Sequence, residues 1–90
     1  MIIETVLIVT ALGTLACLTL SKVRNWLRNR AATKYGDLIK RDLRNGKVEI
    51  ISIGLTASGT RTGQKTWTAK SLDPELAATF GYSQTARITV

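Results

Sequence analysis

The sequence contains no histidine, a single cysteine and a single proline, and only 6% of its residues are aromatic. Without histidine the chain has no ordinary general base near neutral pH, and its lone cysteine can form neither a disulfide framework nor a zinc site. The 6 acidic residues form no spaced pair beyond a helix cap. We therefore expect a non-enzymatic protein with no catalytic residues, no metal and no cofactor.

The chain also has few acidic residues, and it is short. Its 90 residues carry 13 Lys and Arg against 6 Asp and Glu, for a net charge of +7. If the N-terminal residues lie in lipid and a helix follows them, the compact part has about 45 residues, which is close to the limit at which a hydrophobic core is stable alone. The chain is therefore expected to be a subunit of a larger assembly, with copies of itself or other subunits as partners.

What the sequence does contain is a long apolar run, residues 2–20, interrupted by one charge at Glu4. As a helix it would be about 28 Å long, which matches the hydrocarbon thickness of a bilayer. The run predicts a transmembrane helix over residues 1–21, and the alternative is a helix buried between subunits. The residues expected inside the span include Ile2, Leu7, Leu12, Gly13, Cys17 and Leu20.

Small residues recur within this run at a helical spacing. Gly13, Cys17 and Ser21 are four residues apart, so that they would share one face of the helix. Such a stripe allows helices to pack closely in lipid and predicts helix–helix association through these three residues.

A basic segment follows the apolar run. Its cations are Lys22, Arg24, Arg28, Arg30, Lys34, Lys40, Arg41, Arg44 and Lys47. Beside a span, such residues set the membrane orientation, attract anionic lipid headgroups or bind an anionic partner such as nucleic acid. The positive-inside rule predicts that the N-terminus crosses the membrane and that the C-terminal part is cytoplasmic, or faces the matching side of a virion membrane.

The apolar periodicity continues into the basic segment. Val23, Leu27 and Leu38 are among residues that recur at three- and four-residue steps, which predicts a basic amphipathic juxtamembrane helix over residues 22–46. Gly36 is a plausible kink in this helix, and Gly46 a stop signal.

Residues 47–90 have a different character, with β-branched residues in place of the helical period. Residues 47–57 and 64–70 predict two strands joined by a glycine turn. Asp73 and Pro74 predict the start of a short helix that ends at Phe80, and residues 85–90 predict a last strand. The expected fold class is α+β: a long N-terminal transmembrane and amphipathic helix, then a small β-β-α-β domain.

The spacing of a few N-terminal residues matches a known family. Glu4 is followed nine residues later by Gly13 and then by Leu15 and Ala16. In this spacing the region resembles the first helix of type IV pilins, and residues 47–57 with the later Thr-Trp-Thr are similar to pilin strands. The resemblance implies a pilus-like filament in which Glu4 pairs with the N-terminal amine of a neighbouring subunit. The chain departs from the family in lacking the proline after the span and the C-terminal disulfide.

The function expected from these features is that of a non-enzymatic, single-pass membrane-anchored structural or assembly subunit. A membrane-containing virion, in which a small anchor links bilayer to capsid, suits its size and charge, and a pilus-like filament is a second form of the same class. An alternative is a small membrane-acting toxin or regulator, which needs only the span and its basic flank.

The other alternative is a membrane-tethered nucleic-acid-binding adaptor. In this hypothesis Trp67 either stacks a base or belongs to the core. The cations assigned to nucleic acid are Lys40, Arg41, Arg44, Lys47, Arg61, Lys65 and Lys70.

Overall fold

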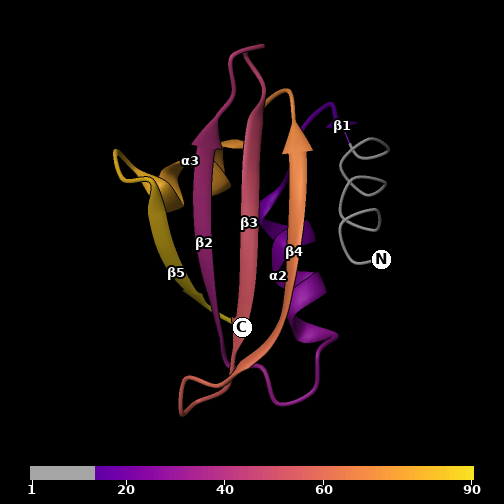
Figure 1. Cartoon of the computed structure of the whole chain (residues 1–90), viewed down its shortest axis with the longest axis vertical. Helices are drawn as coiled ribbons and strands as arrows, with labels where there is room; N and C mark the ends of the chain where they lie inside the picture. Colours follow the sequence, from indigo (N-terminus) through magenta and orange to yellow (C-terminus); the bar gives the residue numbers. More distant parts are fainter. Residues whose placement is uncertain (1–13) are drawn as a thin grey trace.

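The computed structural model describes residues 14–90. Five strands in these residues form one sheet in the order β1-β4-β3-β2-β5 (Figure 1). Strands β2, β3 and β4 are antiparallel neighbours, β5 is antiparallel to β2, and β1 is parallel to β4. The elements are β1 Thr14–Leu15, α2 Leu20–Arg28, β2 Tyr35–Asp42, β3 Val48–Leu55, β4 Arg61–Ala69, α3 Pro74–Phe80 and β5 Thr85–Thr89.

Helices α2 and α3 cover the same face of the sheet, behind the strands in Figure 1. The core lies between these helices and the sheet. It consists of Leu18, Leu20, Val23, Leu27, Leu38, Ile50, Trp67, Ala69, Leu76, Phe80 and Ile88. No helix within residues 14–90 covers the opposite face, which we call the open face.

A row of three glycines crosses the sheet beneath the C-terminal end of α2. The strand register places Gly36 beside Gly54, and Gly54 beside Gly63. A Cβ atom on Gly36 would collide with Cδ1 of Leu27, and one on Gly63 would collide with the guanidinium of Arg30. Because these positions have no side chain, α2 comes close enough to the sheet to bury Leu27 completely.

Asp73 joins the beginnings of the two helices. Its Oδ1 atom accepts a hydrogen bond of 2.9 Å from the backbone N–H of Leu76, which caps α3. The same oxygen is 3.4 Å from the backbone N–H of Leu20, the first residue of α2. The segments that the sequence predicts after residue 46 correspond in type and order to β3, β4, α3 and β5, although β4 begins at Arg61, inside the predicted glycine turn.

The expected long helix is wrong, and with it the predicted fold class. The described residues form a small, mostly-sheet domain with two short helices, and residues 35–42 of the expected amphipathic helix form strand β2. The helical period misled because Leu38 and Ile39, adjacent in sequence, are both apolar. In β2 they lie on opposite faces: Leu38 is buried under the helices and Ile39 lies on the open face. Apolar residues on both faces hide the two-residue alternation of a strand.

The single-pass membrane interpretation is also corrected. Ile2, Leu7, Leu12 and Gly13 lie outside the described residues, but the rest of the expected span is not one helix, because Thr14–Leu15 is a strand. Leu20 begins α2 and is buried in the core of the domain rather than against lipid. No helix in residues 14–90 is long and apolar enough to cross a membrane.

The glycine row predicts a coupling between Gly36 and Leu27. We expect Gly36→Ala to lower the free energy of unfolding by about 1–3 kcal/mol through overpacking, and Leu27→Ala by about 2–5 kcal/mol through a cavity. In the double variant the new methyl group occupies space that Leu27 has vacated, so the loss is smaller than the sum of the two. Urea unfolding of the four proteins measures this difference, and strictly additive losses would contradict the proposed contact.

Candidate interaction surfaces

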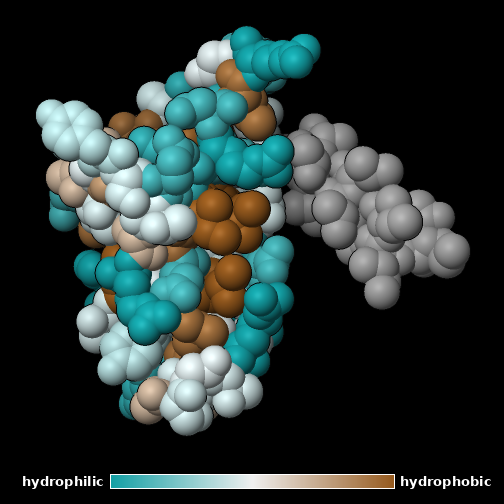
Figure 2. All heavy atoms as spheres, turned by 60° about the vertical axis from the view of Figure 1, so that its left-hand side comes forward, coloured by the Kyte–Doolittle hydropathy of each residue, from teal (hydrophilic) through white to brown (hydrophobic). Residues whose placement is uncertain are grey.

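The open face carries a continuous set of aliphatic side chains. Ile51, Ile53 and Leu55 alternate along β3 on this face, and Ile39 of β2 pairs directly with Ile51. All four are partly exposed, and we call them the aliphatic stripe. Figure 2 shows hydrophobic side chains as a band bordered on both sides by hydrophilic ones. Exposed apolar surface of this kind is typical of a site that contacts another macromolecule.

Two ion pairs lie on the same face beside the stripe. Arg87 of β5 holds both carboxylate oxygens of Asp37 in β2, with Nε–Oδ1 and Nη2–Oδ2 distances of 2.6 and 3.1 Å. Arg41 Nη1 lies 3.2 Å from Oε1 of Glu49, its direct cross-strand partner in β3. The hydrogen bond from Arg87 and, to a smaller extent, the positive charge of its guanidinium lower the pKa of Asp37. Partial burial of the carboxylate acts in the opposite direction but is outweighed. Both carboxylates of this face are therefore paired.

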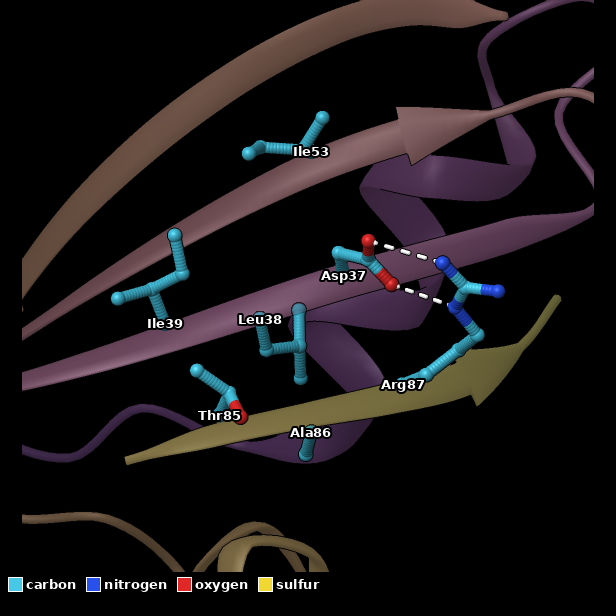
Figure 3. A pocket seen from close by; sticks show the side chains of 7 residues that line it. All are labelled: Asp37, Leu38, Ile39, Ile53, Thr85, Ala86 and Arg87. Atoms are coloured by element: carbon cyan, nitrogen blue, oxygen red, sulfur yellow. Dashed lines mark hydrogen bonds and ion pairs between the residues drawn. The ribbon is translucent and has the colours of Figure 1, made fainter. Parts of the chain in front are cut away.

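A hollow opens between the stripe and the Asp37–Arg87 pair. It has a volume of about 340 Å³ and is lined by Asp37, Leu38, Ile39, Ile53, Thr85, Ala86 and Arg87. In Figure 3 the two charged side chains point toward each other across β2 and β5. Because Arg87 occupies both oxygens of Asp37, the carboxylate offers no free base, and the arrangement suits the insertion of an aliphatic side chain.

The cations that the sequence assigns to lipid or an anionic partner do not share one face. Lys22, Arg24 and Arg28 lie on α2, and Arg30 and Lys34 follow it. Lys40 and Arg41 are in β2, and Arg44 and Lys47 are in the β2–β3 hairpin. Lys40 lies over the ring of Phe80 on the helix side of the sheet, whereas Arg41 is paired with Glu49 on the open face.

The predicted stripe of small residues is also dispersed. Gly13 lies outside the described residues, Cys17 is exposed in the loop after β1, and Ser21 is exposed on α2. Cys17 and Ser21 therefore do not lie on a common helix, and no packing surface of the expected kind joins them.

A cluster of cations and aromatic rings lies between α2 and β4. The rings of Trp26 and Trp67 meet edge to face, with 5.9 Å between their centroids. Arg30 lies 5.3 Å from the ring centroid of Trp26, and Lys65 lies 5.5 Å from that of Trp67. Trp67 is only 6% exposed, so it belongs to the core and has no free face for a base.

Sequence reasoning named Arg61, Lys65 and Trp67 as candidates for binding nucleic acid but did not predict the open face or the cluster that Lys65 and Trp67 form with α2, although signals for this cluster exist. Gly63, Lys65 and Trp67 are two residues apart, the spacing of one strand face, and Trp26 and Arg30 are four apart, the spacing of one helix face. Joining the two signals requires knowing that α2 packs on β4.

Comparison with protein families, with curated proteins and with solved structures found no match to this chain. The resemblance to type IV pilins therefore stays a prediction, and Glu4 lies outside the described residues. Within residues 14–90 no group of three or more potential ligand side chains could hold a metal ion. The candidate sites of the described residues are the open face with its hollow and the cation–aromatic cluster.

The ion pair on the open face predicts a shifted titration. Because the folded-state pKa of Asp37 is depressed, its stabilising effect is present above the ordinary carboxyl pKa and is lost as the pH falls through the folded value. We expect Arg87→Gln to raise the pKa of Asp37 toward its usual range, as measured by NMR titration of the side-chain carboxyl. Arg41→Gln removes the other ion pair of the face and should leave the pKa of Asp37 unchanged.

Proposed function

We propose that the protein is a non-enzymatic assembly subunit that associates through its open face with the same face of a second copy. The observation that carries this proposal is the aliphatic stripe, which no helix within residues 14–90 covers. Two sheets that pack face to face bury alternating side chains in a layer about 10 Å thick. Ile39, Ile51, Ile53 and Leu55 have the β-branched or branched shape that such a layer accommodates.

The distribution of charge favours a second copy as the occupant. Asp37, Arg41, Glu49 and Arg87 form two ion pairs, so the charges beside the stripe are balanced. Outside these pairs, residues 14–90 carry eleven cations and three carboxylates, which would make two copies repel each other through any other surface. Packing through the open face keeps most of these cations away from the contact. Arg61, the cross-strand partner of Leu55, lies at one end of the stripe and is the exception.

The hollow beside the stripe supplies shape for such a contact. In a twofold-symmetric dimer each surface feature is used twice, so a side chain that enters the hollow of one copy has an equivalent in the other. The side chains of Ile39, Ile53 and Thr85, which line the hollow on the open face, would contact an aliphatic side chain of the facing sheet. Insertion of a side chain into each hollow would fix how the sheets of the two copies are positioned against each other.

We expect Ile53→Thr to weaken dimer formation because it removes apolar contact while keeping the β-branched shape of the strand. Since the substitution acts in both copies, the dissociation constant should rise by about tenfold to a hundredfold. Sedimentation velocity over a range of protein concentrations measures this shift directly.

The matched control is Tyr82→Thr. Tyr82 is fully exposed in the turn after α3, so its replacement removes an exposed apolar side chain away from the open face and should leave the dissociation constant unchanged. Thermal unfolding of Ile53→Thr checks that the fold is retained. A wild-type protein that stays monomeric at all concentrations, or an Ile53→Thr variant that associates as tightly as wild type, would refute the proposal.

A further inference from the structure

The outer edge of β4 is only partly paired within the described residues. Strand β1 pairs with it at Thr68 and Ala69 alone, and the next contact on this side is the bridge between Leu18 and Leu72. From Arg61 to Trp67 no strand of residues 14–90 lies beyond β4, as the sheet order shows. Unpaired backbone groups along a strand edge are a template for an added strand.

Basic side chains flank this edge without carboxylate partners in the described part of the chain. Arg30 donates from Nε to the backbone oxygen of Thr62 at 3.1 Å, which places its guanidinium against β4. Lys65 lies over the ring of Trp67, and Arg61 has only a hydrogen bond of 3.4 Å to Gln64. The ion pairs of residues 14–90 involve other residues. Cations at an edge discourage pairing with a second copy of the same basic edge.

We propose that the outer edge of β4, from Arg61 to Trp67, binds an extended acidic segment of a partner protein as an additional strand. Main-chain hydrogen bonds would pair the partner segment with β4, and the cations beside the edge would favour segments that carry carboxylates. Gly63 and Lys65 are two residues apart and lie on the helix side of β4. Carboxylates at alternate positions of the added strand would therefore lie near Arg30 and Lys65.

The aromatic residues of the cluster favour a peptide over a single-stranded nucleic acid. Binding of single strands depends on aromatic faces on which bases stack. Here Trp67 is almost fully buried, and Trp26 has its ring in contact with Trp67 and Arg30. The cluster thus offers charge and a strand edge, while one tryptophan ring lies in the core and the other contacts Trp67 and Arg30.

A direct test titrates the full chain with a fluorescently labelled, capped heptapeptide in which Glu alternates with Val, and measures anisotropy. The same peptide with Gln in place of Glu tests the role of charge, and oligothymidylate tests the nucleic-acid alternative. We expect the Glu peptide to bind about tenfold more tightly than the Gln peptide at low salt and to weaken as salt is added. Amide NMR shifts should be centred on residues 61–67.

The deciding variant is Lys65→Glu, with Arg44→Glu as its matched control. Lys65 is exposed beside the edge, whereas Arg44 is exposed in the β2–β3 hairpin. Lys65→Glu should weaken the Glu peptide about tenfold and improve binding of a peptide with Lys at the same positions, while Arg44→Glu should change neither. Four results would each overturn the proposal. The Gln peptide could bind as tightly as the Glu peptide, or oligothymidylate could bind more tightly than either. The amide NMR shifts could be centred on β5, or the peptide could show no saturable binding.

Discussion

The close contact between α2 and the glycine row determines how the rest of the domain is arranged. Leu27 is completely buried because Gly36 carries no side chain beneath it, and Gly54 leaves space for the hydroxyl of Thr62. Nearby, the hydroxyl groups of Thr33 and Thr62 lie 2.7 Å apart and connect the start of β2 to β4. A side chain at Gly36 would push Leu27, and with it the end of α2, away from the core that stabilises a domain of this size.

This packing makes the two faces of the sheet different. The helix side is closed by α2 and α3, whose first turns share the carboxylate of Asp73. The open face retains its aliphatic stripe, and the carboxylates of Glu49 and Asp37 on this face are held by Arg41 and Arg87. An apolar face whose carboxylates are both paired with arginines, on a strongly basic protein, is a direct consequence of which face of the described sheet the helices occupy. It is the physical basis of the proposed assembly.

The cation–aromatic cluster depends on the same contact. Arg30 can reach the backbone of β4 only because Gly63 leaves space for its guanidinium. The arrangement places positive charge beside the outer edge of the sheet, while the balanced charges remain on the open face. The two proposed surfaces are therefore distinct: one would bury apolar side chains between copies, and the other would pair backbone with an acidic strand.

Local signals in the sequence were sufficient for β3, β4, α3 and β5, because turns and caps such as that of Asp73 depend on neighbouring residues along the chain. They were insufficient for β2, where apolar residues on both faces imitate a helical period and only pairing with β3 and β5 determines the strand. The composition by itself established a basic chain without histidine and with too few cysteines for a disulfide. Which face stayed open, and where Arg30 met β4, was decided by tertiary structure, because both follow from a helix packing on residues distant in sequence.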